Sequence, residues 1–241
     1  MIEEKPGFRP LYRQVYDFMV KQLTDGAWKP GEALPSEQAL AGQLGVSQGT
    51  VRKALDVMAQ EQLLDRQQGK GTFVSTHTQE RALFRFFRLR HAGGGSFGVP
   101  SSEDEVVERR KAGESELSAL AIDGPADVYE IRRTRLLDGT PAIFETVIVP
   151  AARFPGLDTH QPLPNALYQL YQHVYGVNIV TADEELKADL AGSEDRARLK
   201  LPAGAPVLQI RRVALALDGG RAELRISRCD TRRFVYAVSL R

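Results

Sequence analysis

The sequence predicts an α+β protein in two parts: a small helical head that ends in a hairpin, and a larger domain built on a largely antiparallel sheet. Apolar residues recur every three or four positions in the first 60 residues, which is typical of amphipathic helices. From residue 83 onward, alternating runs of β-branched and aromatic residues dominate, and two Asp-Gly steps fall between such runs. A length of 241 residues suits one large domain or two moderate ones.

The composition is that of an ordinary globular protein. The 32 basic and 31 acidic residues give a formal net charge of +1, and 42% of the residues are hydrophobic. No apolar run approaches the roughly 18 residues of a membrane span, and the first ten residues lack the features of a signal peptide. We therefore expect a cytoplasmic protein in which any nucleic-acid binding depends on local geometry rather than on overall charge.

Three helices are predicted in the head. An apolar stripe runs along residues 11–23 and forms the first helix. Ser36 is a good N-cap for the second helix, which ends at Gly45. Ser47 caps a third helix only two residues later, and so short a turn predicts a helix-turn-helix. The buried face of the third helix is expected to consist of Val51, Ala54, Leu55 and Met58.

A hairpin and a linker are expected to follow. Residues 65–74 read as two short extended pieces around Gly69, Lys70 and Gly71, which predicts a wing with a basic tip. Residues 75–82 lack an apolar period and are interpreted as a linker. The chain is thereby divided into a head at residues 1–74, a linker at 75–82 and a second domain at 83–241.

One face of the third predicted helix is polar. Gln48 and Arg52 lie four residues apart, as do Gly49 and Lys53, and all four project from the side opposite the apolar face. The major groove of B-DNA accepts one such helix. The alternative is the solvated face of an ordinary helical bundle, which the tight turn and the basic-tipped hairpin disfavour.

Five short motifs follow one another along residues 10–74: LPSE, LA, GVS, TVRKAL and QGKGTFV. In this order and spacing they resemble the winged helix of GntR-type bacterial transcription regulators. In that family an arginine commonly reads guanine at the position of Gln48, and because glutamine prefers adenine, different central bases are expected here. The resemblance implies DNA binding by Ser36, Ser47, Gln48, Gly49, Thr50, Arg52, Lys53, Gly69 and Lys70.

The second domain is predicted to add helices at residues 114–121, 166–174 and 193–199 to its sheet. Arg133 and Arg135 lie two apart in a predicted strand, so both side chains leave the same face. Two guanidinium groups suit a carboxylate or a phosphate. The alternative is an Arg–Glu network that stabilises the sheet without a ligand.

The second domain also carries ordered motifs, namely FFRL, IRRTRLLDGTPAIFETVIVP, FPGL, ALYQLYQHVYG and AELRISRCDTRRFVY. They resemble the UTRA domain of the HutC branch, which shares its fold with chorismate lyase. The resemblance implies a small effector molecule. Ala166 stands where some members use a serine for phosphorylated amino sugars, so the resemblance argues against a sugar phosphate and is compatible with a carboxylated metabolite, although the expected effector class remains a carboxylate- or phosphate-bearing metabolite. The effector-binding residues implied or compatible are Phe87, Arg88, Arg133, Arg135, Glu145, Tyr168 and Glu223.

No catalytic residue, metal site or cofactor is expected. Cys229 is the one cysteine, and the four histidines are scattered without a neighbouring nucleophile or carboxylate pair. The glycine-rich run at 93–98 lacks a Walker lysine and is interpreted as a loop.

The sequence therefore predicts a one-component transcription regulator, expected to be a repressor. It is expected to bind a pseudo-palindromic operator as a homodimer and to respond to a small anionic metabolite. Two alternatives remain open. The C-terminal half could be a lyase-like enzyme, although a shared fold does not transfer chemistry, or the protein could regulate transcription without an effector.

Overall fold

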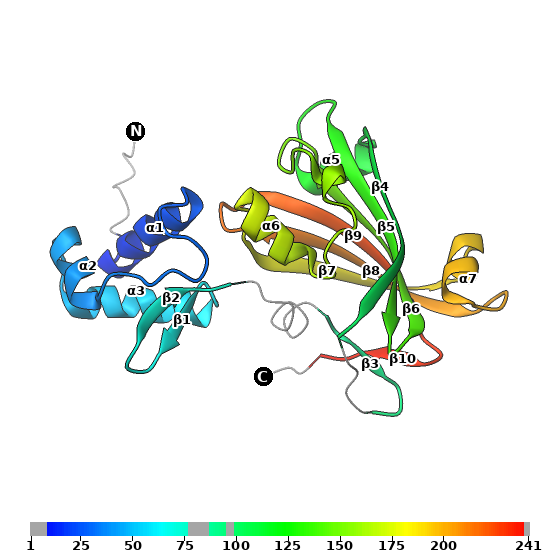
Figure 1. Ribbon diagram of the computed structural model, residues 1–241, viewed down its shortest axis with the longest axis horizontal. Helices are drawn as coiled ribbons and strands as arrows, with labels where there is room; N and C mark the ends of the chain where they lie inside the picture. Colours follow the sequence, from blue (N-terminus) through cyan, green and yellow to red (C-terminus); the bar gives the residue numbers. More distant parts are fainter. Residues whose placement is uncertain (1–8, 77–86, 95–98, 239–241) are drawn as a thin grey trace, which may run out of the picture. The chain divides into compact units, whose positions relative to one another are not determined.

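The computed structural model describes residues 9–76, 87–94 and 99–238 (Figure 1). The chain divides into two compact units, residues 1–76 and 77–241. Most of the linker expected at 75–82 lies outside the described residues. No described helix is long and apolar enough to cross a membrane.

The first unit contains the three expected helices: α1 (Leu11–Thr24), α2 (Glu37–Leu44) and α3 (Gln48–Gln60). Local sequence sets their ends. The Ser36 hydroxyl accepts a hydrogen bond from the backbone N–H of Ala39, and the Ser47 hydroxyl accepts one from Thr50. Gly45 ends α2 in the left-handed conformation, at φ 64°. The helices pack through buried residues: Val15 and Met19 of α1, Leu40 and Ala41 of α2, and the four residues expected from α3, Val51, Ala54, Leu55 and Met58.

The wing is an antiparallel pair formed by β1 (Leu64–Gln67) and β2 (Gly71–Val74). Its tip turns through Gly69 and Gly71, both at positive φ. On the other side of β2, Ala33 forms a β-bridge with Phe73. The wing is therefore tied to the segment that leads into α2.

A six-stranded antiparallel sheet forms the centre of the second unit, in the strand order β4-β5-β6-β9-β8-β7 (Figure 1). A separate ribbon pairs β3 with β10. The sheet strands are β4 (Ser101–Lys111), β5 (Asp127–Leu137), β6 (Thr140–Pro150), β7 (Ile179–Leu190), β8 (Pro206–Ala216) and β9 (Arg221–Asp230), and the ribbon strands are β3 (Leu89–His91) and β10 (Phe234–Tyr236). Half of the strand expected over FRFFRL, residues 84–86, lies outside the described residues, and of the other half Leu89 lies in β3.

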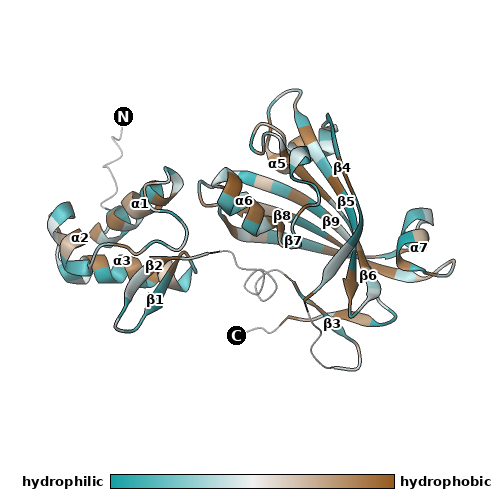
Figure 2. Ribbon diagram, in the orientation of Figure 1, coloured by the Kyte–Doolittle hydropathy of each residue, from teal (hydrophilic) through white to brown (hydrophobic). Residues whose placement is uncertain are grey.

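Helices cover both faces of this sheet. Helix α6 (Leu167–Tyr175) packs on a large apolar cluster that includes Ile131 and Val147. Residues of the opposite face, such as Val128 and Phe144, pack with α5 (Glu114–Leu120) and α7 (Ser193–Leu199). A short 3-10 helix, η1 (Leu157–His160), precedes α6. Figure 2 shows hydrophobic and hydrophilic residues alternating along several of the strands, as expected for a sheet with two different faces.

The Asp-Gly steps predicted to turn the chain do so. Asp138 and Gly139 join β5 to β6 with φ values of 48° and 72°, the left-handed pair that a two-residue hairpin turn needs. Asp218 and Gly219 join β8 to β9. The first turn aligns Arg133 of β5 with Glu145 of β6.

Candidate DNA-binding and effector-binding sites

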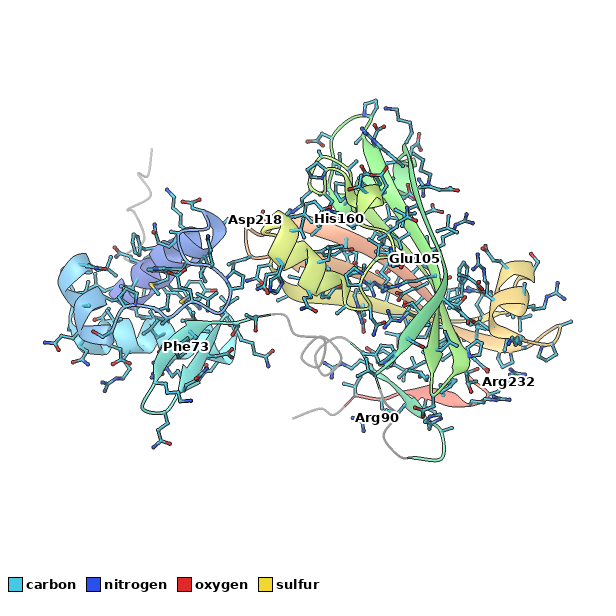
Figure 3. All side chains as sticks on the ribbon, viewed as in Figure 1. Phe73, Arg90, Glu105, His160, Asp218 and Arg232 are labelled. Atoms are coloured by element: carbon cyan, nitrogen blue, oxygen red, sulfur yellow. The ribbon has the colours of Figure 1, made fainter. Side chains whose placement is uncertain are left out.

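The first two turns of α3 present a polar face. Gln48, Gly49, Arg52 and Lys53 are exposed, and the ammonium of Lys53 lies 4.3 Å from the centre of the Tyr12 ring. The hydroxyls of Ser36 and Ser47 accept the helix-capping bonds. The Ser47 hydroxyl also shares a 2.9 Å hydrogen bond with the Thr50 hydroxyl, whereas the Ser36 hydroxyl can donate its proton to an acceptor such as a phosphate oxygen. The wing carries Gly69 and Lys70 at its exposed tip, and Figure 3 labels Phe73 on β2 of the same hairpin.

Glu37, the first residue of α2, lies at the centre of an ion-pair network that sequence analysis did not single out. Its Oε2 atom accepts a hydrogen bond from the Arg52 Nε atom at 2.9 Å and one from the Gln48 Nε2 atom at 3.3 Å. The Nη2 atom of Arg66 lies 3.4 Å from Glu37 Oε1 and 2.9 Å from Asp56 Oδ1. The hydrogen bond from Arg52 lowers the pKa of Glu37 from its ordinary value. One carboxylate therefore contacts two residues of α3 and one of the wing.

The second site is an ionic cluster between α6 and the sheet. Arg133 Nε donates a hydrogen bond to Glu145 at 2.5 Å, and Arg225 Nη1 lies 3.3 Å from the same carboxylate. Arg225 also forms a two-pronged pair with Glu223 of its own strand, at 2.9 and 2.8 Å. Arg133 and both glutamates are almost fully buried. Glu105 of β4, labelled in Figure 3, adds a carboxylate 3.9 Å from Arg133.

Helix α6 closes this cluster with two tyrosines. Glu223 accepts hydrogen bonds from the hydroxyls of Tyr168 at 3.0 Å and Tyr171 at 2.9 Å. Burial, reinforced by the Glu223 charge, raises the pKa of both phenols. Because their pKa values are raised, both tyrosines act as neutral donors at any ordinary pH. The Arg225 guanidinium also lies 5.5 Å from the centre of the Tyr168 ring.

Electrostatics keep Glu145 ionised in this buried position. Burial by itself raises the pKa of Glu145, but the charges of Arg133, Arg225 and Arg135 outweigh burial and hold the pKa well below its usual range.

Arg135 differs from its neighbours because it binds neutral groups. Its Nη1 atom donates to Ser102 Oγ at 3.1 Å and to the backbone oxygen of Asn165 at 2.9 Å. The salt bridges of the described residues include none to Arg135. Burial, followed by repulsion from Arg133, lowers the pKa of Arg135 to about 9, so the side chain is still a cation at neutral pH. Within the described parts of the chain, a positive charge thus lies inside the protein without a carboxylate that pairs with it directly.

The structure gathers five of the seven effector-site residues expected from the sequence in this cluster: Arg133, Arg135, Glu145, Tyr168 and Glu223. The other two lie elsewhere. Phe87 packs against the apolar cluster around Leu89 and Phe234, and Arg88 is exposed just before β3.

Sequence analysis missed five partners in the cluster, namely Ser102, Glu105, Asn165, Tyr171 and Arg225. Arg225 stands two residues after Glu223 in a predicted strand, so strand alternation alone could have placed it on the same face. Asn165 acts through its backbone oxygen, which no residue type signals.

Two family models match separate stretches of the chain. Residues 11–74 match the bacterial regulatory proteins of the gntR family, and residues 98–235 match the UTRA domain. The chain belongs to the GntR family and carries a UTRA domain. The resemblance inferred from the sequence motifs is confirmed.

Relatives of this GntR-family protein include repressors from two bacteria. The mannosyl-D-glycerate transport/metabolism system repressor MngR of Escherichia coli (strain K12) is 31% identical, with 84% of each chain covered. The transcriptional repressor NagR of Bacillus subtilis (strain 168) is 30% identical over 87% of this chain and 86% of its own. The ligand-binding domain of a GntR-family transcriptional regulator from Bordetella bronchiseptica has a similar structure, with a TM-score of 0.60 and 29% identity, covering 65% of this chain and 98% of that one.

Little in this GntR-family protein points to catalysis. In the described parts of the chain, no group of three His, Cys, Asp or Glu residues could hold a metal ion. Burial raises the pKa of the Cys229 thiol, which disfavours the nucleophilic thiolate. That the protein is not an enzyme stays a prediction, in keeping with relatives that are transcriptional regulators.

Proposed function

We propose that this GntR-family protein is a transcriptional repressor that binds operator DNA as a homodimer and responds to a small anionic metabolite bound at Arg135. Helix α3 supplies base contacts through Gln48 and Arg52, and the wing supports binding through Lys70. The relatives named above as repressors support the direction of regulation.

Arg135 carries the assignment of an anionic effector. A buried cation without a charged partner is strongly unfavourable, and a bidentate carboxylate or phosphate is the group that best offsets it. The neutral contacts to Ser102 and Asn165 are ones an anion can replace. Arg133 is already engaged by Glu145, so the preference for an anion centres on Arg135.

Arg135→Met tests this assignment. Because it replaces an unpaired buried charge by an apolar group, we expect the variant to melt at the same temperature as the wild type or higher when no anion is added. Its melting temperature should not respond to a panel of small carboxylates and phosphates, whereas at least one member should raise that of the wild type.

Arg133→Met is the matched control for this test. It removes the cation that pairs with the buried carboxylate of Glu145, so we expect the control to melt at a lower temperature than the wild type. Equal destabilisation by both substitutions, together with an unchanged anion response in Arg135→Met, would contradict the assignment.

Strand β7 offers the surface for a homodimer. It is an edge of the sheet, and it exposes 47% of Leu186 and 64% of Leu190. In this edge-to-edge arrangement, β7 pairs antiparallel with β7 of a second copy. If the pairing is centred on Leu186, the two Leu186 side chains meet and Lys187 lies opposite Glu185 of the other chain. If it is centred on Ala188, Leu186 lies opposite Leu190 and Lys187 lies opposite Asp189. Pairing centred on Lys187 would oppose two lysines. The edge is therefore self-complementary in charge as well as in apolar surface.

Lys187→Glu should weaken this dimer because it sets like charges opposite each other. In sedimentation equilibrium we expect its dimer dissociation constant to rise about tenfold or more. Lys111→Glu, on the other edge strand β4, changes the charge equally and should leave the constant unaltered. Dimers of equal strength in Lys187→Glu and the wild type would place the interface elsewhere.

A further inference from the structure

We propose that Glu37 is a positioning residue for DNA recognition: its carboxylate holds Arg52 with the free edge of the guanidinium set to meet a guanine. The proposal rests on the assignment of Arg52 to the DNA-binding face.

The contact between Glu37 and Arg52 uses one particular edge of the guanidinium. Both Nε and Nη2 of Arg52 lie 2.9 Å from Glu37 Oε2. Because the guanidinium is a rigid planar group with five donors, this leaves Nη1 and the second N–H of Nη2 on the edge away from Glu37. Two parallel donors on that edge match the O6 and N7 acceptors that guanine presents in the major groove.

Glu37 is itself well anchored. It is the first residue of α2, directly after the capping Ser36, so its charge is favoured by the helix N-terminus. Its side chain is only 19% exposed, and its second oxygen faces Arg66 of the wing. The side chain of Arg52, by contrast, is 57% exposed. A fixed carboxylate therefore restrains a side chain that would otherwise have to be ordered when DNA binds.

The negative charge of Glu37 also opposes non-specific binding. A carboxylate beside Arg52 offsets part of the positive charge that would attract any phosphate. A base edge that accepts two hydrogen bonds still gains the free edge of the guanidinium. Glu37 is therefore expected to increase the difference between the preferred sequence and other sequences.

The test measures discrimination between two duplexes by the full-length chain. One duplex is selected by the wild type from a randomised pool, and the other is a scrambled version of it. Discrimination is the dissociation constant for the scrambled duplex divided by that for the selected duplex. We expect Glu37→Gln to lower this ratio about tenfold or more, because glutamine keeps the shape of glutamate but lacks the charge that fixes Arg52.

Asp56→Asn is the matched control, since it removes one charge beside Arg66 but leaves the contact between Glu37 and Arg52 in place. It should keep the ratio within about threefold of the wild type. An unchanged ratio in Glu37→Gln overturns the proposal. If Glu37→Gln does not fold, Glu37→Asp replaces it, with the same expected loss because its carboxylate is withdrawn by one methylene.

A double-mutant cycle separates positioning from a merely structural role. If Glu37 acts through Arg52, Glu37→Gln should not change the ratio further in an Arg52→Ala background. Equal effects in both backgrounds would show that Glu37 acts by another route. If Arg52→Ala alone binds the selected duplex as the wild type does, the assignment of the DNA-binding face fails first, which is a different outcome.

Discussion

Arg52→Ala is expected to lower the affinity for the selected duplex about a hundredfold or more, with little change in the stability of the head. One bidentate contact with a base typically changes discrimination by about tenfold to a hundredfold, and a homodimer makes the contact twice. The side chain of Arg52 is 57% exposed, and alanine is a strong helix former, so the fold should persist. Fluorescence anisotropy with a labelled duplex measures the affinity, and circular dichroism checks the helices.

The control for Arg52→Ala is Arg196→Ala, which removes an exposed arginine from α7 in the second unit. It should bind the duplex normally. If Arg52→Ala weakens binding to selected and scrambled duplexes equally, Arg52 contacts phosphates rather than bases. Normal affinity in Arg52→Ala would remove α3 from the DNA-binding face altogether.

Glu145→Ala is expected to destabilise the second unit by about 3–5 kcal/mol, the usual result of breaking a buried ion pair. It leaves Arg133 and Arg225 without the carboxylate they share, and removes a negative charge that acts on all three arginines of the cluster, Arg135 included. Urea unfolding, monitored by far-ultraviolet circular dichroism, measures the loss of stability. Glu108→Ala, an exposed residue of β4, should change stability by less than about 0.5 kcal/mol. A similar small change in Glu145→Ala would mean that the cluster stabilises nothing.

The pH dependence of stability should report the same interaction. The folded-state pKa of Glu145 lies below its unfolded value of about 4.3, so the carboxylate stabilises the protein above that pH and loses its contribution as the pH falls toward the folded-state pKa. Between about pH 6 and pH 3, the wild type should therefore lose stability more steeply than Glu145→Gln. Parallel curves would contradict the role assigned to Glu145.

Much of the fold follows from short-range features of the sequence. Ser36 and Ser47 cap helices because their hydroxyls reach the free N–H groups of the next turn. Asp138 and Gly139 turn a hairpin because they tolerate the left-handed conformation. The charged run of β7 keeps strand alternation, and its polar residues are tolerated because it lies at the sheet edge.

The candidate sites were only partly predictable because their contacts cross long stretches of sequence. Strand alternation places Arg133 and Arg135 on one face, and the hairpin register brings Glu145 beside them. The contact of Glu37 with Arg52 joins residues 15 apart in sequence and depends on how α2, α3 and the wing pack. Neither composition nor periodicity encodes that packing.

The most direct test of the whole account joins the two sites in one titration. The dissociation constant for the selected duplex is measured with and without the panel anion that most raises the melting temperature of the wild type. We expect the anion to change this constant about tenfold or more in the wild type and to leave it unchanged in Arg135→Met. A constant that does not respond to the anion in the wild type would contradict the claim that Arg135 links a small anion to DNA binding.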